Sequence, residues 1–163
     1  MTSAREIPTA HTPPGGYGAV LPAPILAGCD EPLAEAAPDL RGTWRVADLS
    51  VDGVPLPAEH PLWQHVERIE QAADRVVITS DGIIHDMYAD GSYDNGVNDV
   101  TAIDYTTAIV VAASFEDGAL VLRPRDLPDI DGQRAEVRRW REGEELVWSF
   151  LGAFVARLRR DAA

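Results

Sequence analysis

One short stretch of the chain concentrates the side chains that are most useful for chemistry. Residues 84–99 contain one histidine, four aspartates, two tyrosines and two asparagines. Histidine has an ordinary pKa close to neutrality, so His85 is the candidate general acid or base, and Asp99 is the carboxylate that would tune it. Tyr88 or Tyr105 would then donate a hydrogen bond to a developing oxyanion. In this interpretation His85, Asp99 and Tyr105 form a catalytic group.

The same stretch is also typical of tight turns. Asp90-Gly91 and Asn95-Gly96 favour turns, because Asx side chains bond to nearby backbone groups and glycine adopts a positive φ. Such clusters mark hairpins far more often than they mark sites. His85 would then be a partly buried strand residue whose ring is already hydrogen-bonded. The residue types alone leave both interpretations open.

Familiar metal and nucleotide motifs do not occur in the sequence. His60 and His65 are five residues apart with Trp63 between them, and no Cys/His pair has the spacing of a zinc site. The acidic turn that begins at Asp90 lacks the glutamate that ends a calcium loop. Neither a Gly-x-Ser-x-Gly elbow nor a phosphate-binding glycine motif is present. We therefore expect no metal and no cofactor.

The overall charge restricts the class of partner. Fourteen basic and 27 acidic residues give a formal net charge of −13. A chain with this charge repels polyanions, so neither nucleic acid nor an anionic membrane is an expected partner. A length of 163 residues with 45% hydrophobic content suits one domain with its own core. We expect a monomer or a homodimer that does not insert into a membrane.

The single cysteine raises a question about cellular location. Leu26-Ala27-Gly28-Cys29 matches the pattern that precedes a lipidated cysteine in exported bacterial lipoproteins. A signal peptide needs a positive start and an uninterrupted apolar run, but Glu6 cancels Arg5 and two prolines interrupt the run before Cys29. We expect a cytoplasmic protein, with export as a lipoprotein through Cys29 as the alternative.

The chain divides into two zones near residue 40. Residues 1–40 hold seven of the twelve prolines and show neither helical nor strand periodicity. The first sixteen residues are expected to form a mobile tail. The stretch Tyr17–Leu33 is too apolar for a free linker. We expect it to cover the outside of the second zone, residues 41–163, or to act as a lid across its mouth.

Residues 41–163 show the pattern of an all-β domain. Short segments alternate apolar and polar residues, and Asp-Gly pairs separate several of them at the spacing of tight hairpins. This pattern predicts a single antiparallel up-and-down β-barrel of 8–10 strands, with the irregular N-terminal zone as an extension. The predicted strands are Thr43–Val51, Val66–Gln71, Arg75–Ser80, Ile83–Ala89, Val97–Tyr105, Ala108–Glu116, Ala119–Arg123, Arg134–Arg141, Glu145–Phe150 and Phe154–Arg159.

A short motif at the start of the first strand links this pattern to a known family. Gly42-Thr43-Trp44, together with Arg157 or Arg159 near the C-terminus, resembles the lipocalin-like (calycin) β-barrels. The resemblance implies that Trp44 closes one end of the barrel, beside Gly42, and that Arg157 lies across its indole ring. Related barrels include bacterial proteins that are similar to fatty-acid-binding proteins and lipocalin-like polyketide cyclases of secondary metabolism.

The resemblance implies a function in which the barrel encloses a small hydrophobic molecule. Alternation does not decide which strand face lines the interior, because small barrels have apolar residues on both faces. The alternative is a cofactor-independent cyclase or isomerase that holds a hydrophobic substrate in a reactive fold, where positioning supplies the rate. The residues expected to bind the ligand are Trp63, Met87, Tyr88, Phe115, Trp148 and Phe150.

Overall fold

Ten strands build a barrel, and little other regular structure accompanies them. The computed structural model describes residues 2–125, 135–150 and 153–161. A short strand, β2 (Val54–Pro55), and two 3-10 helices, η1 (Ala4–Glu6) and η2 (Pro61–Gln64), lie outside the barrel wall. The barrel strands are β1 (Gly42–Val51), β3 (Val66–Ala72), β4 (Arg75–Ser80), β5 (Ile83–Tyr88), β6 (Val97–Val100), β7 (Ala108–Glu116), β8 (Ala119–Pro124), β9 (Val137–Glu142), β10 (Glu145–Phe150) and β11 (Phe154–Arg160).

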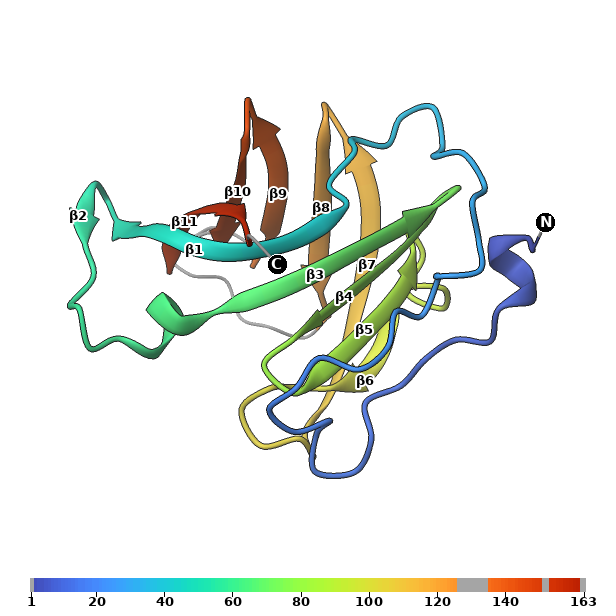
Figure 1. Ribbon diagram of the computed structural model, residues 1–163, viewed down its shortest axis with the longest axis horizontal. Helices are drawn as coiled ribbons and strands as arrows, with labels where there is room; N and C mark the ends of the chain where they lie inside the picture. The colour runs from blue at the N-terminus through green and yellow to red at the C-terminus, as the bar shows by residue number, and fades with distance from the viewer. Residues whose placement is uncertain (1, 126–134, 151–152, 162–163) are drawn as a thin grey trace.

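The strands form one nearly closed antiparallel up-and-down barrel, which confirms the predicted fold class. Their order is β5-β4-β3-β1-β11-β10-β9-β8-β7-β6, and β2 pairs with β1 beside this path (Figure 1). The barrel closes where β5 approaches β6, and there the Tyr88 N–H donates to the Asn95 carbonyl at 2.8 Å. We call this approach the seam.

Two predicted strands differ from the structure by more than one residue at one end. The predicted strand Val97–Tyr105 stops at Val100, because the Asp104 carboxylate accepts hydrogen bonds from the Thr106 and Thr107 N–H groups and forms a turn. Tyr105 has a φ of 58° inside that turn, so it does not share a strand face with Asp99 as predicted. The predicted strand from Arg134 begins at Val137 in the structure, and residue 134 lies outside the described residues.

The two ends of the barrel follow from its antiparallel connections. One end holds Trp44 near the start of β1 and the hairpins that join β3 to β4, β7 to β8 and β9 to β10. We call it the Trp44 end. The other end holds η2, the turn between β4 and β5, and the hairpin between β10 and β11, and we call it the η2 end. The apolar core fills the interior between them, from Leu40 and Trp44 to Leu146, Trp148 and Leu158.

The Trp44 end is closed by a stack of cations on the indole. The Arg160 guanidinium carbon lies 4.5 Å from the centre of the Trp44 ring and that of Arg141 lies 5.2 Å away. Gly42 has a φ of 141°, which favours glycine, and a Cβ there would displace the Arg160 guanidinium from the stack. The arginine across the indole is therefore Arg160. The expected Arg157 points to the outside of the barrel, where it pairs with Glu142 and Glu145.

The N-terminal extension covers the outside of β4 and β5. Leu26 and Ala4 are buried against Val77 and Ile84 in a second apolar cluster, and half-buried Cys29 packs against it. A buried cation holds the extension from below, because Arg75 donates to the carbonyls of Ala4 (2.6 Å), Ile7 (2.7 Å) and Pro8 (3.0 Å). The extension thus covers the barrel wall from the outside. None of the helices in the described part of the chain is long and apolar enough to cross a membrane.

The same extension fills the seam. The Thr12 hydroxyl accepts a hydrogen bond from the Ile84 N–H (2.9 Å) on β5, while the Thr12 N–H donates to Asp99 (3.0 Å) on β6. The Ala10 N–H donates to Asp86 at 2.9 Å. Ala10 and Thr12 therefore link β5 to β6, two neighbouring strands that share no ladder.

Candidate functional site

The interior contains a buried ion pair that crosses the barrel. Arg139 on β9 donates from Nε to Glu67 on β3 at 2.8 Å and from Nη2 at 3.1 Å. Their side chains are 6% and 0% exposed. Between β3 and β9 the sheet order places β1, β11 and β10, so the pair reaches across the interior instead of along the wall. We call Glu67 and Arg139 the inner pair.

A histidine links the inner pair to the surface. His65 is 3% exposed and its Nε2 lies 2.7 Å from Glu67, while its Nδ1 lies 2.6 Å from Asp81, which is 49% exposed. Burial lowers the pKa of His65, but hydrogen bonds to Asp81 and Glu67 overcome this effect and raise it to about 9. The ring is therefore an imidazolium near neutral pH, and it donates to both carboxylates.

The charge of Glu67 is fixed by its two partners. Complete burial would raise the pKa of this carboxyl group, but the charge of Arg139 and the hydrogen bond from His65 lower it to about 2. Glu67 is thus an anion, and Arg139 and His65 are cations beside it. Clusters of buried groups with shifted pKa values occur preferentially at functional sites, although structural ion pairs also produce them.

Aromatic side chains surround this polar group toward the η2 end. Trp148 lies against His65, with 4.5 Å between ring centres, and under the Arg139 guanidinium at 4.8 Å. Phe154 meets the Trp148 ring edge-on at 4.8 Å, and Phe150 lies 5.9 Å from Phe154. Phe150 and Phe154 are half-buried and pair across the β10–β11 hairpin. Along the strands they lie two residues closer to the η2 end than Trp148 and its partner Ala156.

Local structure holds the loop that borders this end. Pro61 begins η2, and the ring nitrogen of His60 accepts a hydrogen bond from the Leu62 N–H at 3.2 Å. The Trp63 indole donates to the Pro57 carbonyl at 2.9 Å, which ties η2 back to the preceding loop. Leu62 and Trp63 pack against the core as half-buried residues. The polar and aromatic group is therefore bordered by an ordered loop.

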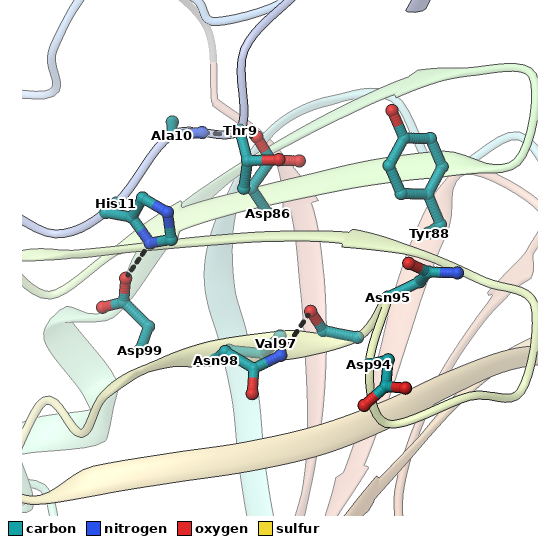
Figure 2. A pocket seen from close by; sticks show the side chains of 11 residues that line it. Thr9, Ala10, His11, Asp86, Tyr88, Asp94, Asn95, Val97, Asn98 and Asp99 are labelled. Carbon is teal, nitrogen blue, oxygen red and sulfur yellow. Dashed lines mark hydrogen bonds and ion pairs between the residues drawn. The ribbon is translucent and has the colours of Figure 1, made fainter. Parts of the chain in front are cut away.

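A second candidate region lies on the outside, at the seam. A hollow of about 330 Å³ lies between the N-terminal extension and β6. Figure 2 shows Asp86 and Tyr88 on one side of it and Asp94, Asn98 and Asp99 on the other. Tyr88 faces outward under the Arg5 guanidinium, whose central carbon is 4.8 Å from its ring centre. Most residues that line this hollow have polar side chains, and the hollow lies outside the barrel wall, so Tyr88 does not line the interior.

The proposed catalytic residues are separated. His85 faces the interior and Nε2 lies 2.9 Å from the Val100 carbonyl, so this nitrogen carries the proton. Burial lowers the pKa of His85 and keeps the ring neutral. Asp99 instead contacts His11 at 3.3 Å on the outer side of the seam (Figure 2). Tyr105 lies at the η2 end and donates to the Asp81 carbonyl at 2.8 Å. The structure brings His85 and Asp99 to one seam and leaves Tyr105 apart.

The predicted ligand-binding residues fall into three places, one of which is the outer hollow beside Tyr88. Trp63, Trp148 and Phe150 gather at the η2 end around the inner pair. Met87 is 1% exposed and pairs with Val76, deep in the core toward the Trp44 end. Phe115 is half-buried beside the β7–β8 hairpin, also at the Trp44 end. Three of the six expected residues therefore share one region.

Sequence reasoning missed the polar centre of that region. Glu67 and Arg139 stand in segments where charged residues alternate with apolar ones, a pattern that normally places charges outside. Glu67 and Arg139 differ from the exposed charges only because they lie on the strand face that points into the barrel. The alternation of apolar and polar residues did not show which face that is.

The described residues contain no group of three or more His, Cys, Asp or Glu side chains arranged to hold a metal ion. No protein-family model matches the chain, and no curated protein matches it.

Proposed function

We propose that this protein is a lipocalin-like barrel that binds one small, largely apolar molecule at its η2 end. The observation that carries the proposal is the group of half-buried aromatic residues there, Trp63, Phe150 and Phe154, above the buried Glu67–Arg139 pair. Binding sites for small molecules are mostly lined by apolar and aromatic side chains, with a few polar groups that fix orientation. The η2 end has this composition.

The energetic cost of the inner pair supports the same conclusion. Taking two charges out of water costs several kcal/mol per ion, and well-packed apolar residues often replace such a pair without loss of stability. The barrel nevertheless keeps Glu67 and Arg139 in its interior, and places His65 beside them. Because apolar residues could fill these positions at similar stability, the presence of the ion pair favours a role in recognition.

The Trp44 end supports the lipocalin-like assignment. Gly42, Trp44 and a C-terminal arginine lie together there in the arrangement that the resemblance implies, with Arg160 in the place expected for Arg157. A cation on an indole face is worth about 0.5–2 kcal/mol and closes that end of the barrel. Entry of a ligand is therefore expected at the opposite end, where the half-buried aromatic residues lie.

Native mass spectrometry of the purified protein tests this function. We expect a one-to-one adduct of a hydrophobic compound, either retained from the host or taken up from an added panel of naphthalene derivatives. Phe154→Ala should weaken the adduct, because it removes part of the aromatic lining. Phe115→Ala is the matched control, since Phe115 is a half-buried phenylalanine at the other end. If no adduct forms, or if both variants weaken it equally, the proposal is wrong.

One observation favours catalysis as a second candidate. His85 carries a neutral imidazole that faces the interior, which is the state a general base of a cyclase or isomerase needs. A catalyst should lose turnover of the bound compound in His85→Ala while keeping the adduct, whereas a carrier should keep its affinity and convert nothing. Product analysis of the extracted compound after incubation with each protein separates the two.

A further inference from the structure

The Trp148 indole differs from the other three in its hydrogen bonding. Trp44 donates to the Leu40 carbonyl at 2.9 Å, Trp63 to the Pro57 carbonyl at 2.9 Å, and Trp140 to Glu142 at 3.1 Å. Trp148 is 9% exposed, and its Nε1 has no hydrogen-bond partner among the described residues. A buried polar group without a partner costs about 1–3 kcal/mol, and most native structures avoid it.

The position of this nitrogen distinguishes it from the two other buried polar atoms without a partner. Arg68 Nε and Thr79 Oγ1 lie on the outer face of β3 and β4, next to segments of the N-terminal extension. Trp148 alone faces the interior, in the aromatic group at the η2 end. Its unmet donor is therefore in the region where we place the ligand.

The nearby carboxylates bond to other donors and do not reach this nitrogen. Glu67 Oε1 accepts from His65 (2.7 Å) and Arg139 (3.1 Å), and Oε2 accepts from Arg139 (2.8 Å). The other carboxylate of the group, Asp81, lies beside His65 at 2.6 Å on the rim. Because no described residue places an acceptor within hydrogen-bond distance of Trp148 Nε1, we look for its acceptor in the ligand.

The charges nearby select the kind of acceptor. Arg139 is neutralised by two hydrogen bonds to Glu67, and His65 is shared between Glu67 and Asp81. An anionic ligand would lie beside the Glu67 carboxylate in a chain whose net charge is −13. The indole N–H is itself a neutral donor. A neutral oxygen suits this environment better than a carboxylate.

We propose that the ligand carries a neutral carbonyl oxygen that accepts a hydrogen bond from Trp148 Nε1, with its apolar part against Phe150 and Phe154. This inference rests on the proposed function, since it names the chemical class that the η2 end recognises. A hydrogen-bonded carbonyl would satisfy the buried donor. A hydrocarbon of the same shape would leave it unsatisfied, and sites built around a polar group discriminate in this way.

Three naphthalene probes of one shape test the inference: 2-acetylnaphthalene, 2-isopropenylnaphthalene and 2-naphthoate. They present a ketone, an alkene and a carboxylate in the same position. We expect the ketone to bind roughly five- to tenfold more tightly than the alkene, the range of one net hydrogen bond. In Trp148→Phe the ketone and the alkene should bind equally, with alkene affinity unchanged. Trp140→Phe, at the other end of the barrel, should keep the ketone preference.

The indole resonances of ¹⁵N-labelled protein give a direct second readout. The signal that is absent in Trp148→Phe belongs to Trp148, and its proton should move downfield with the ketone and stay in place with the alkene. Equal affinities for ketone and alkene would overturn the inference and leave the proposed function intact, as would preference for the carboxylate. A Trp148 signal that is already downfield without a probe, and is unmoved by the ketone, shows a water partner and overturns it too. If none of the probes binds, both proposals are wrong.

Discussion

Two buried ion pairs in this barrel have the same chemistry and opposite surroundings. The inner pair, Glu67–Arg139, lies in the interior, and the outer pair, Arg75–Asp86, lies on the outer face under the N-terminal extension. The side chains of Arg75 and Asp86 are 0% and 1% exposed, and two hydrogen bonds of 2.9 and 2.6 Å join them. Both pairs are therefore desolvated to a similar degree.

The remaining donors of the two arginines differ. Arg75 gives its other hydrogen bonds to the carbonyls of Ala4, Ile7 and Pro8, so it fixes the extension to the barrel wall. Arg139 instead faces the aromatic ring of Trp148. The outer pair therefore holds the irregular N-terminal extension in place, whereas the inner pair puts polar groups into the barrel interior. The outer pair is structural, and we propose that the inner pair serves recognition.

Replacing each pair by apolar residues should give the largest contrast. In Arg75→Met with Asp86→Leu, the three carbonyls lose their buried donor, and each unsatisfied group costs about 1–3 kcal/mol, so we expect a loss of about 3 kcal/mol or more. In Glu67→Leu with Arg139→Met, we expect a smaller loss, because apolar residues often replace a buried ion pair without loss of stability, while His65 keeps Asp81 as its partner. Urea unfolding followed by circular dichroism measures both. Equal changes in the two double variants would contradict the division of roles.

Between pH 6.5 and pH 9, stability should depend on pH chiefly through His65 beside the inner pair. The pKa of His65 is about 9 in the folded protein, above its ordinary 6.5, so protonation stabilises the fold. This contribution, on the order of 3 kcal/mol, is complete below pH 6.5 and is lost as the pH rises through 9. The free energy of unfolding, measured from pH 6 to pH 10, should therefore fall across this window.

Two variants test the assignment of that pH dependence. His65→Gln should remove the fall, because its side chain does not titrate. Asp81→Asn should move the fall to lower pH, because it removes one of the two carboxylates that raise the pKa of His65. A fall that persists in His65→Gln would mean that another group causes it. Arg75→Met should leave the window in place, since the outer pair contains no histidine.

Deletion of residues 1–12 should have a smaller effect than loss of the outer pair. It removes the carbonyls that cover Arg75, but water then solvates the guanidinium, and the entropic cost of ordering residues 1–12 disappears. We expect a loss of about 2 kcal/mol and faster hydrogen exchange along the seam, where Thr12 no longer accepts from the Ile84 N–H. Probe binding at the η2 end should change less than twofold. A large loss of probe affinity would instead identify the extension as a lid.

The strands were predictable because their information is local. Period-two alternation and Asp-Gly turns located all ten barrel strands, and errors were confined to ends such as that of β6, where Asp104 caps a turn. The η2 end was partly predictable, since Trp63, Trp148 and Phe150 were expected to bind the ligand. Its polar centre was not, because nothing in the sequence near Glu67 shows that Arg139 lies opposite.

The fold class, the turn positions and the place of Gly42 and Trp44 at the start of the first barrel strand could be derived from the amino-acid sequence, since each depends on residues close together in the chain. The arginine that covers Trp44 and the strand face that points inward could be found only in the folded barrel. The choice of that face placed Glu67 beside Arg139, which is 72 residues away along the chain. It also decided that Arg75 holds the N-terminal extension and that the Trp148 N–H is left without a partner among the described residues. Barrel closure brings strands that are far apart in sequence into contact, and these contacts determine which partner each buried charge has.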